Sequence, residues 1–184
     1  GLLASYSMIT LDTETVSTHR LVQTVLRLPP PAATGPSSRA IRLLATAAPS
    51  NPDRDTTGWP LWRDLLPHIA ALAEHLPDST DHALGRLLNQ AAVFEVGQGL
   101  YAQAELHSTR ALSIAEAALG PDHPDVAIRL GNLAVSYRDL GRPNDAVPLE
   151  QRALTITETA LGPDHPDVRS EERRVGKECC GGGG

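Results

Sequence analysis

Two runs of apolar residues at helical spacing define the C-terminal half of the chain. The first run begins at Pro124 and the second at Pro143, and glycines, Gly141 and Gly162, follow their ends. Proline is favoured at the first position of a helix and glycine just past the last. The apolar positions are Leu130, Leu133, Ala134 and Tyr137 in the first run, and Ala146, Leu149, Ala153, Leu154 and Ile156 in the second. The pattern predicts two amphipathic helices joined by a short turn.

The second helix and the loop after it occur twice. Leu119–Val126 returns unchanged at Leu161–Val168, 42 residues later, and Arg110–Ala118 differs from Arg152–Ala160 at only three positions. A unit of this size cannot bury its own apolar face, so successive copies must stack to make a core. The repeat therefore predicts an array of helix pairs.

The earlier copy departs from the later one in its first helix. Glu95 stands where Tyr137 predicts an aromatic residue, and Phe94 lies one position away. We expect that this helix is rotated or carries an extra residue before its turn. A bulky position of the second helix holds Ser108 in one copy and Glu150 in the other, which predicts a modest core.

The complete unit resembles a tetratricopeptide repeat of the longer, kinesin-light-chain-like type. The residues that carry the likeness are Leu130-Gly131-Asn132-Leu133-Ala134, Tyr137, Gly141, Asp145-Ala146, Arg152-Ala153-Leu154-Thr155-Ile156 and Leu161–Val168. The resemblance implies an all-α fold, a tetratricopeptide-like α-solenoid of antiparallel helix pairs. We assign residues 79–168 to it.

The N-terminal residues 1–28 are unlike the repeats. Ser7–Leu11 and Thr15–Thr18 form strand-like runs that predict a β-hairpin, and a helix is expected over His19–Leu28. This stretch resembles the end of the winged-helix domain of NB-ARC-type signalling ATPases. A wing that reads DNA is disfavoured, because few basic residues are present to neutralise phosphates.

Two further segments connect this remnant to the repeats. Residues 29–38 form a proline-rich linker, and Ser37 or Ser38 is expected to cap the helix that follows. Residues 39–78 are interpreted as a degenerate helical pair, kinked or interrupted at Pro67, that caps the array. We expect Trp59 and Trp62 to pack against the next unit rather than bind a ligand.

The end of the chain differs in composition from the rest. Residues 169–184 hold the single lysine and both cysteines of the 184-residue sequence. They resemble a translated sequencing adapter, so we predict a non-native or disordered tail. Without them the chain is acidic, lacks cysteine and uses only arginine as its basic residue. These properties indicate a reducing, cytoplasmic setting in a bacterial cell and no nucleic-acid partner. No apolar run is long enough to span a membrane.

Motifs of catalysis are absent from the sequence. It has no phosphate-binding loop, no G-x-S-x-G and no H-E-x-x-H, so no enzyme activity is expected in this piece. Asp122, His123 and Asp125 could be imagined as metal ligands, but a turn with His123 at the N-cap position accounts for them. We expect neither a cofactor nor a metal.

The tetratricopeptide resemblance implies candidate binding residues on the first helix of each unit. Asn132 occupies the position whose asparagine commonly bonds the backbone of a bound peptide, and Gln90 is its counterpart one repeat earlier. Arg129, Arg138 and Asp139 are expected to set the charge preference. The alternative is that Asn132 bonds between helices and that the arginines are solvated.

The function expected from these observations is protein–protein interaction through a bound protein or peptide. The preferred interpretation is a non-catalytic fragment of a signalling ATPase, and the alternative is a free-standing kinesin-light-chain-like scaffold. Because the last repeat lacks a C-terminal neighbour, self-association or fraying of its last helix is also expected.

Overall fold

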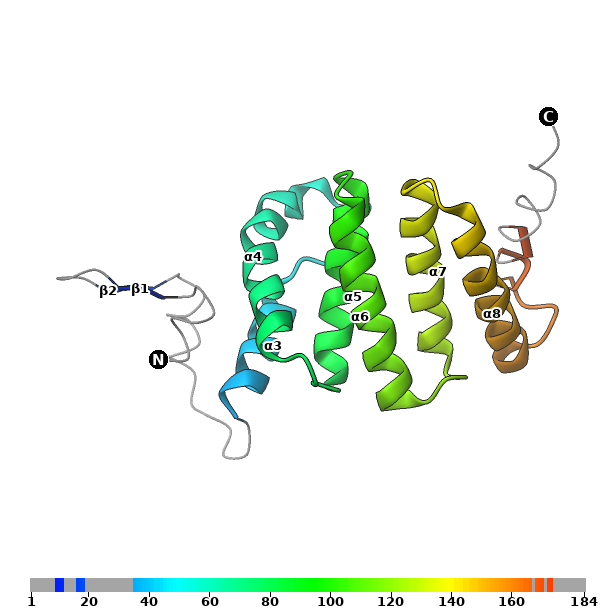
Figure 1. Cartoon of the computed structure of the whole chain (residues 1–184), viewed down its shortest axis with the longest axis horizontal. Helices are drawn as coiled ribbons and strands as arrows, with labels where there is room; N and C mark the ends of the chain where they lie inside the picture. Colours follow the sequence, from blue (N-terminus) through cyan, green and yellow to red (C-terminus); the bar gives the residue numbers. More distant parts are fainter. Residues whose placement is uncertain (1–8, 12–15, 19–34, 167, 171, 174–184) are drawn as a thin grey trace.

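Consecutive α-helices form almost all of the described structure (Figure 1). The computed structural model describes residues 9–11, 16–18, 35–166, 168–170 and 172–173. In chain order the helices are α3 (Pro36–Ala47), the 3-10 turn η1 (Thr56–Gly58), α4 (Trp59–His75), α5 (His82–Gly97), α6 (Tyr101–Leu119), α7 (Pro124–Asp139) and α8 (Pro143–Leu161). The pairs α5–α6 and α7–α8 pack most extensively, which makes each a helical hairpin.

The two hairpins are copies of one another along their whole length. α7 begins and ends 42 residues after α5, and α8 begins and ends 42 residues after α6. Burial repeats with the same offset. The buried residues that correspond are Leu84, Gly85, Leu87, Leu88, Asn89, Ala91, Ala92 and Phe94 on α5, and Val126, Ala127, Arg129, Leu130, Gly131, Leu133, Ala134 and Ser136 on α7. Glu95 on α5 is also buried, whereas its counterpart Tyr137 is half-buried. The predicted helical repeat is therefore present.

The expectation of a rotated helix or an inserted residue in the first copy is wrong. Phe94 takes the position of Ser136, and Glu95 takes the position of Tyr137 without a shift of the helix. Glu95 is only 2% exposed, and its Oε2 lies 2.8 Å from Nδ1 of His107 on α6. A polar pair between the helices thus replaces the aromatic contact that the repeat pattern predicts.

Phe94 instead belongs to an aromatic stack with the N-terminal helices. Its ring lies parallel to that of Trp62, with centroids 5.8 Å apart, and the Trp59 ring meets its edge at 6.2 Å. Trp62 is completely buried, together with Leu65, Ile69 and Leu72 of α4. Both tryptophans therefore pack against the next unit, as predicted. We call this the aromatic core.

A second, smaller core joins α6, α7 and α8. Its buried residues are Ala115, Val126, Ala127, Leu130, Ala153 and Ile156. Alanine allows helices to approach closely but buries little apolar surface, so this core contributes less hydrophobic free energy than the aromatic core. We call it the alanine core. The expected modest packing is found here.

The N-terminal part of the helical region differs in detail from the prediction. α3 begins at Pro36, and neither Ser37 nor Ser38 caps it, because Gly35 holds the N-cap position and makes no side-chain bond. The backbone N–H at the first position of a helix has no hydrogen-bond partner within the helix. Proline, which lacks this N–H, therefore loses no hydrogen bond there. α4 continues through Pro67 as one helix.

The residues before and after the helical region are only partly described. Ile9–Leu11 (β1) and Val16–Thr18 (β2) pair antiparallel, with Ile9 opposite Thr18. The helix predicted for residues 19–28 and most of the linker, residues 29–34, lie outside the described residues. Two short strands do not support a winged-helix domain, which stays a prediction.

The described residues after α8 start another helix. Residues 166, 168–170 and 172–173 are helical, and Val168 is completely buried. Val168 is the counterpart of Val126, so the array continues into a further first helix. Residues 169–173 were predicted to belong to a non-native or disordered tail, but those of them that are described are helical. Residues 174–184 lie outside the described part.

Candidate protein-binding face on helices α5 and α7

The first helices of the two hairpins lie side by side and parallel. Near their N-termini, Nε2 of His82 on α5 is 3.4 Å from Oδ2 of Asp125 on α7. Two turns further along, Nδ2 of Asn132 donates a hydrogen bond to Oδ1 of Asn89, at 2.9 Å. Both contacts join residues 43 positions apart, so the two helices run in the same direction and in register.

Asn132 therefore bonds between helices, with Asn89 as its partner and not its repeat counterpart Gln90. A carboxamide offers two N–H donors and two acceptor lone pairs. The bond to Asn89 uses one of the donors. The remaining donor and the oxygen suit the pairing of a peptide N–H and C=O. Asn132 and Gln90 are both half-buried.

Arg129 lies in the interface with the preceding hairpin. It occupies the position that Leu87 holds on α5, and it is only 5% exposed. Its Nε is buried without a hydrogen-bond partner among the described residues. Burial lowers the pKa of the guanidinium, an effect that nearby Asp125 opposes and nearby Arg86 reinforces. The alternative of a solvated arginine is therefore wrong for Arg129.

Arg138 and Asp139 lie at the opposite end of α7 from Arg129. Nη1 of Arg138 is 2.7 Å from Oε1 of Glu150, whose side chain is 1% exposed on α8. A buried carboxylate needs such a partner, so this pair holds α7 to α8. Asp139 is exposed at the last position of α7. The predicted residues therefore do not converge on one point.

Sequence reasoning missed an exposed apolar residue beside Asn132. Ile128 is 55% exposed, one turn before Asn132, and Val135 is half-buried about one turn after it. The same spacing on α5 gives Arg86, Gln90 and Val93, which are also exposed or half-buried. We call these six residues the α5–α7 face. Helical spacing measured outward from Asn132 would have identified them.

The arginine of each second helix binds the loop that precedes the first helix of the same pair. Nη2 of Arg110 donates to the carbonyl oxygens of Leu76 and Ser79, at 3.2 and 3.1 Å. One repeat later, Nη2 of Arg152 donates to the carbonyl of Pro121 at 3.0 Å, and its Nη1 donates to Glu116. Ser79 and Pro121 are again 42 residues apart. The repeated arginine thus sets the position at which each first helix begins.

His123 is the N-cap of α7, as predicted. Its Nδ1 accepts a hydrogen bond from the backbone N–H of Asp125 at 3.1 Å, which requires an unprotonated nitrogen. Asp81 caps α5 in the same way through the N–H of Ala83. Among the residues that the structure describes, no three His, Cys, Asp or Glu side chains gather so that they could hold a metal ion.

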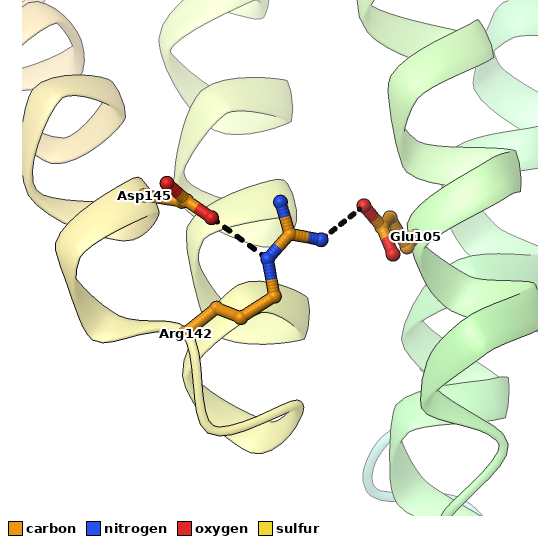
Figure 2. A network of polar contacts seen from close by, with 3 residues as sticks. All are labelled: Glu105, Arg142 and Asp145. Carbon is orange, nitrogen blue, oxygen red and sulfur yellow. Dashed lines mark hydrogen bonds and ion pairs between the residues drawn. The ribbon is translucent and has the colours of Figure 1, made fainter.

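A charged network fixes the second hairpin to the first at the opposite end of the helices. Arg142, in the turn between α7 and α8, places Nε 2.7 Å from Asp145 and Nη1 2.9 Å from Glu105 of α6 (Figure 2). Its guanidinium also lies 4.5 Å from the centre of the Tyr137 ring. The hydrogen bond to Asp145 raises the pKa of Arg142 most, desolvation opposes it, and the hydrogen bond to Glu105 raises the pKa further. The network restrains the α7–α8 turn relative to α6.

Comparison with known proteins agrees with this architecture. Within the described part of the chain, no helix is both long and apolar enough to cross a membrane. A search of curated proteins found no match. Residues 83–159 match the model of the tetratricopeptide repeat family, and this segment spans nearly all of α5–α8. The match and the repeated helical hairpins together support a tetratricopeptide repeat protein.

Proposed function

We propose that the α5–α7 face binds an extended segment of a partner protein. Tetratricopeptide repeats generally mediate protein–protein interaction. The observation that carries the proposal is the placement of Ile128, 55% exposed, one turn from the half-buried Asn132 amide. An apolar side chain beside a polar group with unused hydrogen-bonding capacity suits a peptide, because it offers both kinds of contact.

In this proposal the residues of the face make different kinds of contact with the bound segment. Asn132 and Gln90 bond the backbone of the bound segment, and Ile128 and Val135 contact its apolar side chains. Asp139, at the exposed end of α7, biases the face against acidic residues there. Arg138 acts indirectly, because its bond to the buried Glu150 fixes the position of α7.

Selection of peptides against the full chain tests this function. Peptides selected by the wild type are expected to lose about tenfold in affinity for Asn132→Ala and for Ile128→Ser. Leu106→Ser is the matched control, since Leu106 is 71% exposed but lies on α6. Equal losses for Leu106→Ser and Ile128→Ser, or no loss for either face variant, would refute the proposal.

We also propose that the module is non-catalytic and belongs to a cytoplasmic bacterial signalling ATPase of the NB-ARC type. The likeness of residues 1–28 to the end of a winged-helix domain is the sequence observation behind this origin. The alternative is a kinesin-light-chain-like scaffold without an ATPase domain. The coding sequence upstream of Gly1 decides between them, since a phosphate-binding loop in the same reading frame is expected only for the ATPase.

Self-association through the C-terminal repeat is a further proposal. Leu161, at the end of α8, is 45% exposed and would be covered by another helix pair. Sedimentation of the purified chain over a range of concentrations tests this. A concentration-dependent mass that falls with Leu161→Ser is expected, and a constant monomeric mass contradicts it.

A further inference from the structure

Each helical hairpin contains an acid–base pair between its two helices, and the order of acid and base differs between the hairpins. In the first hairpin the acid is on the first helix, since Oε2 of Glu95 on α5 lies 2.8 Å from Nδ1 of His107 on α6. In the second hairpin the acid is on the second helix, since Oε1 of Glu150 on α8 lies 2.7 Å from Nη1 of Arg138 on α7. The two pairs therefore have opposite orders along the chain.

Both acids are almost completely buried, so each of them depends on its base. The side chains of Glu95 and Glu150 are 2% and 1% exposed. An ionised carboxylate only accepts hydrogen bonds, and its burial is strongly unfavourable when the donor or cation beside it is removed. Each pair thus restricts which helix can pack against the helix that carries the acid.

The two pairs do not occupy equivalent positions of the repeat. Glu95 and Arg138 are 43 residues apart, and so are His107 and Glu150, whereas the repeat offset is 42. Each member of a pair consequently has an uncharged counterpart in the other hairpin. These counterparts are Tyr137 for Glu95, Leu149 for His107, Val96 for Arg138 and Ser108 for Glu150.

Over much of their length the second helices of the two hairpins are nearly identical. Residues 110–118 of α6 and 152–160 of α8 differ at only three positions. α6 also packs against α7 in the native fold, so α7 is placed to compete with α5 for it. Proteins built from similar units characteristically misfold by exchange of such elements, within one chain or between two copies. Correct pairing therefore needs residues that distinguish the hairpins.

Exchange of the second helices would bring the two acids together and the two bases together. If α5 packed against α8, Glu95 and Glu150 would be buried in one interface without the base of either pair. If α7 packed against α6, Arg138 and His107 would share the other interface without an acid of either pair. A wrong partner is rejected effectively when it leaves buried polar groups unpaired.

We propose that the opposite orders of the two acid–base pairs direct each second helix to the first helix of its own hairpin and prevent helix exchange between copies of this chain. Such control of pairing is independent of the proposed peptide binding. Pairs of the same order would stabilise both hairpins equally well. They would not distinguish the hairpins, however, because every acid would again meet a base after exchange.

Reversal of one pair at a time tests the order of the pairs separately from their presence. The first variant combines Glu95→His with His107→Glu, and the second combines Arg138→Glu with Glu150→Arg. Each variant retains a pair in both hairpins but gives the two pairs the same order. The third variant carries all four substitutions and restores opposite orders, which makes it the matched control.

The measurement is the formation of mixed dimers when each full-length variant is refolded from denaturant together with an isotope-labelled copy of itself. Native mass spectrometry after dilution counts the mixed dimers, and copies that are combined only after refolding give the background. Reversible self-association is lost on dilution, whereas exchanged helices separate only by unfolding. At equal concentration, the first and second variants are expected to form about tenfold more mixed dimers than the wild type. The third variant should return to the wild-type level.

Two outcomes would overturn the proposal. One is a wild-type level of mixed dimers in both single-pair reversals. The other is an equal increase in the variant with all four substitutions, since loss of stability and not the order of the pairs would then cause exchange.

A further variant applies if a reversed pair prevents folding, as judged by circular dichroism. Glu95→Tyr with His107→Leu installs the residues that already occupy the counterpart positions of the second hairpin. Because one of the two pairs is then absent, mixed dimers are expected to increase about threefold. No increase in this folded variant would also contradict the proposed role of the pairs.

Discussion

At the scale of single residues, the Arg138–Glu150 pair stabilises the second hairpin. Glu150 is 1% exposed, so removal of Arg138 leaves a carboxylate buried without its closest cation. Arg138→Val is expected to lower the free energy of unfolding by about 3 kcal/mol. The preceding repeat has Val96 and Ser108 at the counterpart positions. The double variant Arg138→Val with Glu150→Ser should therefore recover most of the loss.

Denaturant unfolding of the wild type, both single variants and the double variant measures the coupling between the two residues. A double variant that is less stable than Arg138→Val alone would contradict the assigned role. Glu150→Gln is the control for the effect of the charge, because it keeps the shape of the Glu150 side chain and removes only the charge.

Which residues meet across two helices could be predicted only in part. The offset of 42 correctly predicts which positions are equivalent, and Val168 is buried in the structure as its counterpart Val126 is. It does not predict contacts between α5 and α7, because neighbouring parallel helices meet at positions that are displaced by one. Asn132 therefore bonds Asn89 and not Gln90. Arg129 illustrates the same limit, since an amphipathic pattern cannot indicate that an arginine occupies a buried position.

At the scale of helices and turns, the glycine that ends each second helix has a backbone conformation that other residues rarely adopt. Gly120 caps α6 with φ 90° and ψ 157°. This region is almost exclusive to glycine, and another residue there costs about 2 kcal/mol. Gly120→Ala is expected to destabilise the protein by this amount in denaturant unfolding.

Gly97 provides the matched control, since it ends α5 without a positive φ and a methyl group there would meet no atom within 4 Å. Gly97→Ala should stabilise the protein by about 0.5 kcal/mol through the lower entropy of the unfolded chain. Similar effects of the two substitutions would disprove the conformational argument.

The loop before α7 depends on Arg152. Arg152→Met removes the bonds to the Pro121 carbonyl and to Glu116 and is expected to cost about 1 kcal/mol locally. Hydrogen exchange at the amides of His123 and Asp125 should become about fivefold faster. Gln151→Met is the control, because Gln151 is exposed and adjacent in sequence. Unchanged exchange at these amides would show that the arginine does not hold the loop.

Helix boundaries within the repeats were predictable because proline, glycine and apolar spacing act locally. α7 and α8 begin at the expected prolines, and α8 ends at Leu161. The contacts of Arg110 and Arg152 were not predictable, since each guanidinium reaches a carbonyl 31 residues earlier in the chain. The packing of Trp59 and Trp62 against the next unit was predicted, but their contact with Phe94 was not, because Phe94 was interpreted as a register irregularity.

At the scale of the whole molecule, α6 connects two cores of unequal strength. Ala111 and Ile114 belong to the aromatic core, whereas Ala115 belongs to the alanine core. In a linear array each unit is stabilised mainly by its neighbours. Because the aromatic core buries larger side chains, α3–α5 should resist unfolding under conditions in which α7 and α8 have already unfolded.

This asymmetry predicts two separable unfolding transitions in denaturant. Both tryptophans of the chain lie in the aromatic part, so their fluorescence reports that core, whereas circular dichroism reports all helices. Ile156→Ala in the alanine core should cost about 3 kcal/mol and move the early part of the dichroism transition without moving the fluorescence midpoint. Leu65→Ala, in the aromatic core, should move the fluorescence midpoint. Coincident transitions that both substitutions shift equally would instead mean that α6 couples the cores into one cooperative unit.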